Sequence, residues 1–123
     1  MVSPAVRALR GATTVDADTT EQVSERVQAL VTAMLDRNEV SKEDLISIVF
    51  TATDDIHSMF PATAARACGL GDVPLLCARE LDVESGTPLT VRVLMHVTTE
   101  RARSQLHHVY LERARGLRDD LPA

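Results

Sequence analysis

The chain of 123 residues has almost no aromatic side chains, since Phe, Tyr and Trp together make up 2% of it and Trp is absent. Proteins that stack single-stranded nucleic acid on aromatic platforms are therefore a poor match, and the core must be built from aliphatic side chains. An excess of basic residues is missing as well, because the formal net charge is −5 at pH 7. Nucleic acid is not an expected partner, since phosphate contacts require a basic face.

Cysteine is equally scarce, with Cys68 and Cys77 as the only two. Their spacing does not suit a zinc site of the CxxC type. HExxH and GxSxG patterns are also missing, which leaves no sign of metal chemistry or of a nucleophile elbow. No apolar stretch has the length of a membrane span, and the first residues lack a signal-peptide pattern. We expect a cytoplasmic protein with free thiols, no membrane contact, no metal and no cofactor.

The length suits one domain with a modest core. We assign residues 1–118 to this domain and expect residues 119–123, which include Pro122, to form a mobile C-terminal tail. A small core with few aromatic side chains gains stability from association with other copies. We therefore expect an oligomer.

Hydrophobic periodicity predicts a fold of the α+β class. Apolar residues at helical spacing predict a helix from the N-cap Thr19 to about Asn38, in which Gln22 is expected to complete a capping box. Alternating or continuous apolar runs predict strands over Val6–Val15, Leu45–Thr53, Val73–Val83, Leu89–Thr99 and most of Gln105–Leu117. With a short helical turn opened by Pro61, the expected fold is a mixed five-stranded sheet packed against one long helix.

Arginine carries nearly all of the positive charge, and two arginines lie inside predicted strands. Arg10 ends an apolar stretch, and Arg92 interrupts another. A half-buried arginine is costly without an anionic partner. That partner is either Glu80 or Asp82 of a neighbouring strand, or a bound ligand. With the Tyr110 hydroxyl and the Glu80 carboxylate nearby, the set would suit a small polyanion that carries at least one hydroxyl.

Several motifs occur together over about Val6 to Leu121: "RGATTV" (Arg10–Val15), "TATDDIHSMFPATAAR" (Thr51–Arg66), "VPLLCARELDV" (Val73–Val83) and "HHVYLERARGLR" (His107–Arg118). In this order they resemble the monofunctional chorismate mutases of the trimeric pseudo-α/β-barrel class, as distinct from the all-helical class. The resemblance implies a homotrimer that converts chorismate to prephenate by a Claisen rearrangement in aromatic amino-acid biosynthesis. Such a pericyclic step needs no nucleophile, metal or cofactor.

The resemblance also implies a role for each matching residue. Arg92 would be the catalytic residue, donating to the ether oxygen, while Arg10 and Tyr110 would hold a carboxylate. Glu80, together with Cys77, would bind the ring hydroxyl. The other implied positions are the ring walls Phe60 and Leu75, the neighbouring Leu76, and Arg66, Leu117 and Arg118 at the mouth of the pocket. Each pocket would lie between two subunits, with the small residues Gly11 and Ala12 beside the interface.

Three features differ from the family pattern. Thr63 stands where a lysine is common, Leu76 replaces a threonine, and the loop between Arg66 and Val73 is one residue shorter. These differences concern capture of substrate at the mouth more than the central chemistry. The alternative interpretation is a non-catalytic trimeric module that binds a small carboxylate metabolite. A third interpretation is a trimer with a purely structural role, whose arginines form only internal salt bridges.

Overall fold

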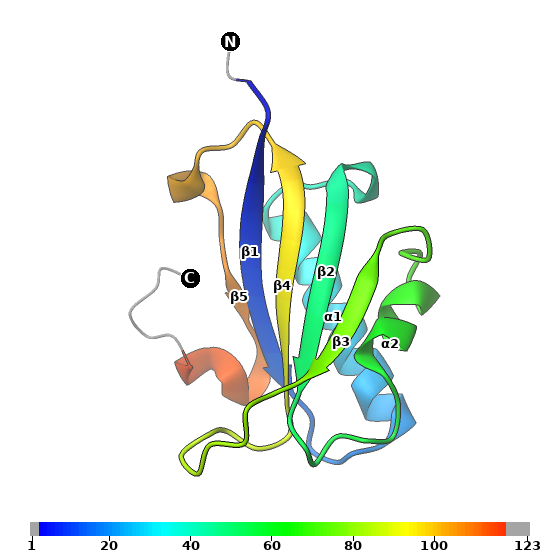
Figure 1. The fold of residues 1–123 in the computed structure, drawn as a ribbon. Helices are drawn as coiled ribbons and strands as arrows, with labels where there is room; N and C mark the ends of the chain where they lie inside the picture. The colour runs from blue at the N-terminus through cyan, green and yellow to red at the C-terminus, as the bar shows by residue number, and fades with distance from the viewer. Residues whose placement is uncertain (1–2, 118–123) are drawn as a thin grey trace.

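The polypeptide forms a single sheet with its helices on one side (Figure 1). The structure is a computed structural model and describes residues 3–117. Its elements in chain order are strand β1 (Ala5–Thr14), helix α1 (Thr20–Arg37), 3₁₀ helix η1 (Lys42–Asp44), β2 (Leu45–Ala52), α2 (Pro61–Ala67), β3 (Leu75–Arg79), β4 (Thr90–Thr99), 3₁₀ helix η2 (Arg103–Gln105), β5 (Val109–Tyr110) and 3₁₀ helix η3 (Glu112–Gly116). The predicted α+β class is confirmed.

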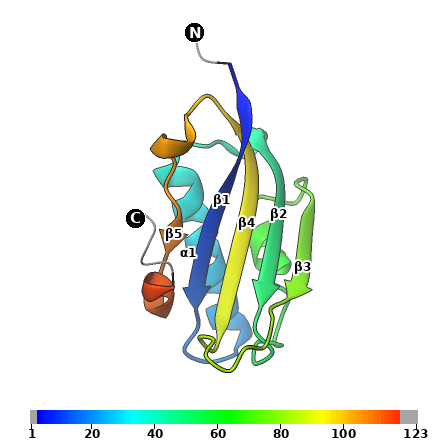
Figure 2. The ribbon, with the colours of Figure 1, turned by 60° about the vertical axis from the view of Figure 1, so that its left-hand side comes forward.

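The five strands lie in the order β3-β2-β4-β1-β5, which Figure 2 shows from a second side. Strands β2 and β3 run parallel, as do β1 and β5, whereas β4 runs antiparallel to both of its neighbours. The sheet is therefore mixed, as the sequence predicts. The central β1–β4 ladder is the longest, since it pairs every residue from Ala5 with Thr99 to Thr14 with Thr90.

Helix α1 covers the sheet with an apolar stripe of residues at helical spacing, all of which are buried: Val23, Val27, Leu30, Val31, Met34 and Leu35. Thr19 is the N-cap, as predicted, because its hydroxyl accepts from the Gln22 N–H at 3.2 Å. The prediction that Gln22 completes a capping box is wrong, because its side chain does not accept from the Thr19 N–H. The side-chain Oε1 of Gln22 accepts from the backbone N–H of Asp16 at 2.7 Å, while the Thr19 N–H donates to the backbone carbonyl of Ala17.

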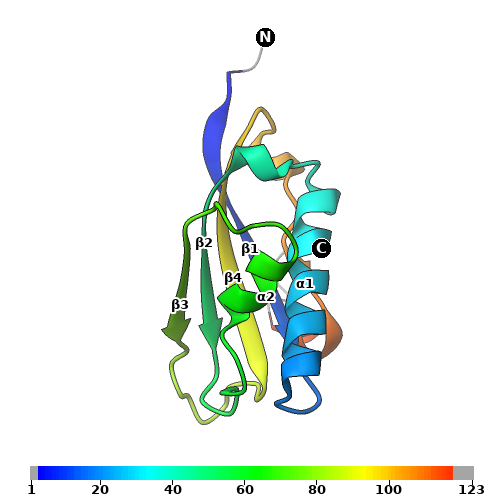
Figure 3. The ribbon, with the colours of Figure 1, turned by 90° about the vertical axis from the view of Figure 1, so that its right-hand side faces the viewer.

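Both helices lie on the same face of the sheet, which leaves the opposite face open (Figure 3). We call this second surface the open face. Because paired residues in a ladder point the same way, Arg10, Leu94, Val49 and Leu76 form one row across it. Leu76 is 63% exposed and Leu94 is 39% exposed. Within residues 3–117, no helix is both long enough and apolar enough to cross a bilayer.

Gly11 lies against α1, although the sequence analysis expects it beside a subunit interface. A Cβ at this position would lie 2.5 Å from the Met34 sulfur and 3.2 Å from Cδ1 of Leu30. Both of those side chains are fully buried. The absence of a side chain at Gly11 therefore allows the helix to approach the sheet closely.

Gly11→Val is expected to destabilise the fold by about 1 to 3 kcal/mol, because the new side chain overpacks the contact with Met34 and Leu30. Urea unfolding at one fixed protein concentration measures this change in the free energy of unfolding. Gly71→Val is the matched control, because a Cβ at Gly71 meets nothing within 4 Å. Equal stability of the two variants would contradict the proposed packing role of Gly11.

The prediction of a strand over most of Gln105–Leu117 is wrong. Only Val109–Tyr110 pairs with β1, and the 3₁₀ helices η2 and η3 flank it. The Asn38 side chain forms hydrogen bonds with both backbone polar groups of His107: it accepts from the N–H at 2.7 Å and donates to the carbonyl at 2.9 Å. Glu112 then has a φ of 55°, which ends the extended backbone. Strand β3 is likewise shorter than the predicted Val73–Val83, since its partner β2 ends at Ala52.

Proline opens α2 as predicted, with Pro61 at its first position and Phe60 at the N-cap. The helix ends before Gly69, whose φ of 97° is a left-handed conformation that favours glycine. The Lys42 ammonium donates to the Cys68 carbonyl at 3.0 Å and so satisfies one of the free acceptors at this helix end. Helix α2 is therefore fixed at its C-terminal end by the only lysine in the chain.

Candidate active site

A cavity of about 340 Å³ opens on the open face. Its size suits a small ligand. Four residues singled out in the sequence analysis, Arg10, Glu80, Arg92 and Tyr110, line it together with Gly11, Val49, Thr51, Val93 and Leu94. We call this space the arginine cavity. The structure thus brings together residues from strands β1, β2, β4 and β5 and from the segment after β3.

Strand register accounts for the position of these side chains. Tyr110 pairs with Ala12, Ala12 with Arg92, and Arg92 with Thr51, so these residues form one row on the open face. The methyl group of Ala12 is the smallest side chain of the row and lies between the two largest. Space is therefore left between the Tyr110 ring and the Arg92 guanidinium, and Arg10 borders the same space from one pleat further along β1.

Arg92 and Glu80 form an ion pair in this cavity, with 2.6 Å between Nε of Arg92 and Oε1 of Glu80. The Thr51 hydroxyl donates to the same oxygen at 3.2 Å. The Nε–H of Arg92 is buried and does not point at the carboxylate well enough to form an aligned hydrogen bond. Of the two internal partners predicted for Arg92, the structure therefore selects Glu80 over Asp82.

Two sets of atoms in the cavity have no partner within residues 3–117. They are the terminal nitrogens of Arg92 and the second carboxylate oxygen of Glu80. The Arg10 guanidinium makes no ion pair with the described residues either, and its backbone N–H donates to the His108 ring at 3.0 Å. Two guanidinium groups against one carboxylate leave an excess of positive charge. The cavity therefore favours an anion that also offers a hydroxyl to Glu80.

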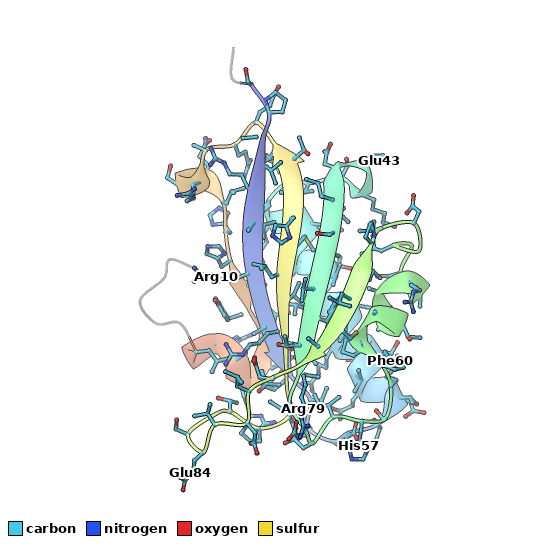
Figure 4. The ribbon with its side chains drawn as sticks, in the orientation of Figure 1. Arg10, Glu43, His57, Phe60, Arg79 and Glu84 are labelled. Carbon is cyan, nitrogen blue, oxygen red and sulfur yellow. The ribbon has the colours of Figure 1, made fainter. Side chains whose placement is uncertain are left out.

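Phe60 and Cys77 do not join this group. They line a separate cleft of about 760 Å³ between β3 and the segment that leads into α2. Figure 4 shows Phe60 beyond β3, at one edge of the sheet, and Arg10 toward the opposite edge, on β1. The Phe60 ring is 70% exposed, and Arg66 is exposed on α2 beyond it. Within one chain, these residues do not approach Arg92.

The remaining predicted positions also lie outside the arginine cavity. Leu75 packs against the core on the helix-covered side, whereas Leu76 points out from the open face. Leu117 is half-buried and follows η3. Arg118 and the predicted tail 119–123 lie outside the described residues. The structure therefore divides the predicted site into the residues of the arginine cavity and a second group on and around β3 and α2.

Four side chains of the described residues have a shifted pKa, namely Asp18, Asp54, Cys68 and Arg79, whose pKa is raised by its bond to Asp54, and none of them lines the arginine cavity. The Arg79 guanidinium lowers the pKa of Asp54, to which it is bound through two hydrogen bonds of 2.6 and 2.7 Å. The Ser58 hydroxyl and backbone N–H groups lower the pKa of Asp18. Burial raises the pKa of the Cys68 thiol, which disfavours the nucleophilic thiolate. No group of three or more His, Cys, Asp and Glu is placed to hold a metal ion in the described part of the chain.

Thr51 is a residue of the cavity that the sequence analysis missed. It lies in an apolar, β-branched run, where a threonine is expected to serve strand formation. Only its register opposite Arg92 and its hydroxyl contact with Glu80 distinguish it. The period of two residues in a strand places Thr51 on the same face of β2 as Val49, and this is the signal that would have placed Thr51 on the open face.

Comparison with known proteins identifies the family. A family model described as chorismate mutase type I matches residues 6–121. The chorismate mutase AroH of Bacillus subtilis is 39% identical over 117 residues, which is 94% of this chain and 92% of that protein. The chorismate mutase AroH of Thermus thermophilus is 44% identical over 117 residues, or 94% and 96% of the two chains.

A solved structure agrees with this result. A chorismate mutase from Clostridium thermocellum superposes with a TM-score of 0.86 at 40% identity, covering 88% of this chain and 96% of the other. This chain therefore belongs to the type I chorismate mutase family.

Proposed function

We propose that this protein is a chorismate mutase that converts chorismate to prephenate. The observation that carries the proposal is the arginine cavity, in which Arg92 is paired through Nε with Glu80 and Arg10 makes no ion pair with any residue of 3–117. Chorismate is a dianion with a ring hydroxyl, which matches two guanidinium groups and one carboxylate acceptor. Membership of the type I family supports the same reaction.

Each residue of the cavity has a role in the proposed complex. The terminal nitrogens of Arg92 donate to the ether oxygen, where negative charge develops as the C–O bond breaks. Arg10 and the Tyr110 hydroxyl hold the nearby carboxylate. The second oxygen of Glu80 accepts from the ring hydroxyl, and Cys77, which lines the other cleft of the same chain, would reach such a pocket only from an adjacent subunit. Thr51 and Arg92 hold the other oxygen and so fix the direction of that acceptor.

The rearrangement is an intramolecular pericyclic shift, so the protein transfers no proton and forms no covalent bond to the substrate. Catalysis then has two sources: restriction of a flexible dianion to its compact conformer, and a positive group already in place at the ether oxygen. An acceleration of roughly a millionfold corresponds to about 8 kcal/mol. Two converging guanidinium groups on rigid strands suit both effects.

We further propose that the working unit is a homotrimer with each pocket between two subunits. The open face carries exposed apolar side chains, including Val6, Leu76 and Leu94, that a neighbouring subunit would cover. Within one chain, neither Phe60 nor Arg66 lines the arginine cavity, and Figure 4 shows Phe60 well away from Arg10. In the trimer, Phe60 and Arg66 would reach the arginine cavity of the adjacent subunit, with Phe60 and Leu75 beside the ring and Arg66, Leu76, Leu117 and Arg118 around the mouth.

The free thiols of Cys68 and Cys77 suit a cytoplasmic location.

The proposal predicts that the purified protein consumes chorismate much faster than buffer does. Loss of the ultraviolet absorbance of chorismate gives the rate, and identification of prephenate gives the product. Turnover with prephenate as the product would support the enzyme. Binding of chorismate without turnover would instead support the non-catalytic carboxylate-binding module, which the comparisons do not favour.

A further inference from the structure

The segment from Asp54 to Phe60 connects β2 to α2, and a single carboxylate from elsewhere in the chain holds its middle. Asp18 lies between β1 and α1. Its Oδ2 accepts from the backbone N–H of His57, which is 39 residues later, and its Oδ1 accepts from the N–H of Ser58, both at 3.0 Å. Asp18 thus uses each of its two oxygens for one backbone group of this segment.

Further contacts strengthen this connection. The His57 ring lies 3.5 Å from the same carboxylate, and the Asp18 side chain is 14% exposed. The Ser58 side chain and the two backbone N–H groups lower the pKa of Asp18, so that it stays ionised at neutral pH. The hydrogen bonds to the carboxylate are those of the two N–H groups, since the buried Ser58 Oγ has no hydrogen-bond partner among the described residues. Hydrogen bonds to an ionised acceptor are stronger than those between neutral groups.

The chain on either side of Phe60 is held by Met59, which packs against the core, and by the buried Pro61, whereas the Phe60 side chain is largely exposed. Its ring is 70% exposed, and its side chain supplies no cap to α2. Upstream, the segment is tied to β3 by the pair of Asp54 with Arg79, and Ile56 is buried in the core. Between Ile56 and Phe60, Asp18 supplies the hydrogen bonds that set the path of the backbone.

We propose that Asp18 is a positioning residue for the reaction: it holds the backbone at His57 and Ser58 so that Phe60 is already oriented to close the pocket. The inference rests on the proposed function and on the role of Phe60 within it. Asp18 acts through the backbone and contacts no substrate. The ordering of Phe60 is then complete before chorismate arrives, which lowers the entropy cost of binding.

Asp18→Asn tests this role, because the amide keeps the shape but offers only one acceptor oxygen. One N–H of the segment then loses its partner and faces an NH₂ group. We expect KM for chorismate to rise about tenfold, while kcat stays within about twofold of the native value. A purely structural defect would lower the amount of active enzyme, and hence kcat, without raising KM. That pattern would overturn the proposal.

The chain provides a matched control two residues away. Asp16 belongs to the same connection between β1 and α1, but its carboxylate pairs with Arg26 at 3.0 Å and makes no hydrogen bond to the Asp54–Phe60 segment. Asp16→Asn should therefore leave KM unchanged. Asp18→Glu keeps the charge and both oxygens but displaces them by one methylene. Its KM should therefore lie between that of the native protein and that of Asp18→Asn. This variant also serves if Asp18→Asn does not fold.

A double-mutant cycle identifies the route by which Asp18 acts. If Asp18 acts through Phe60, Asp18→Asn should have no further effect on KM in a Phe60→Ala protein, although it still lowers the melting temperature. Equal effects of Asp18→Asn with and without Phe60 would refute the inference while leaving the proposed function intact. Failure of the native protein to consume chorismate would instead refute the proposed function itself.

Discussion

Replacement of Arg92 by lysine is expected to reduce kcat by about 10²- to 10³-fold, equivalent to about 3 to 4 kcal/mol of lost transition-state stabilisation. The substitution keeps the positive charge and most of the length of the side chain. A loss of this size therefore depends on the shape of the guanidinium group and on the direction of its N–H bonds.

The geometry of the cavity explains why a lysine cannot substitute. Arg92 approaches Oε1 of Glu80 through Nε at 2.6 Å, and its two terminal nitrogens have no hydrogen-bond partner among the described residues, so that they are available to a ligand. A planar guanidinium can serve both partners at once, whereas an ammonium is a single point charge. The lysine would pair with Glu80 or approach the ether oxygen, but would not hold a fixed position between them.

Steady-state kinetics on chorismate measure the effect. Arg101→Lys is the control, because Arg101 also forms an ion pair with a glutamate, Glu39, but lies beyond the far end of β4 and outside the arginine cavity. This control should retain native kcat. If Arg92→Lys also turned over at a near-native rate, electrostatic catalysis by a forked donor at Arg92 would be excluded.

Much of the fold could be predicted from the sequence because its strongest signals are local. The N-cap at Thr19, the helical spacing behind it and the proline that opens α2 each act over a few residues, and all three predictions are confirmed. The C-terminal segment was mispredicted because its backbone partners are distant in sequence. Asn38 binds His107, 69 residues away, and no local pattern contains that contact.

The candidate site was only partly accessible from the sequence, for a similar reason. An arginine in an apolar strand indicates that it needs an anionic partner, and Arg92 has one in Glu80. The pattern did not identify Thr51, whose role follows from strand register. Composition and spacing also do not predict that Phe60 and Arg92 line different clefts, because this follows only from the folded sheet. The role of Asp18 could not be predicted either, because it depends on the backbone N–H groups of His57 and Ser58, which are distant in sequence and come close only in the fold.

The division of the predicted site between two clefts leads to a second large expected effect, in the homotrimers that we propose, when they are assembled from two defective variants. Arg92→Ala lacks the electrostatic group, and the double variant Phe60→Ala/Arg66→Ala lacks the residues that we propose a neighbour supplies. Each should be nearly inactive alone at low chorismate. After the two are unfolded and refolded together in equal amounts, about a quarter of the pockets should contain no substituted residue. Activity per pocket should recover in proportion.

A second mixture provides the control, because Arg92 and Glu80 lie in one cavity of one chain. When Arg92→Ala is mixed with Glu80→Ala, every pocket keeps one defect in whichever order the subunits assemble, so no activity should return. Recovery in the first mixture but not in the second requires a pocket built from Arg92 of one subunit and Phe60 and Arg66 of another. If neither mixture recovered while both formed trimers, the shared pocket would be ruled out, and Phe60 and Arg66 would have to act within their own chain.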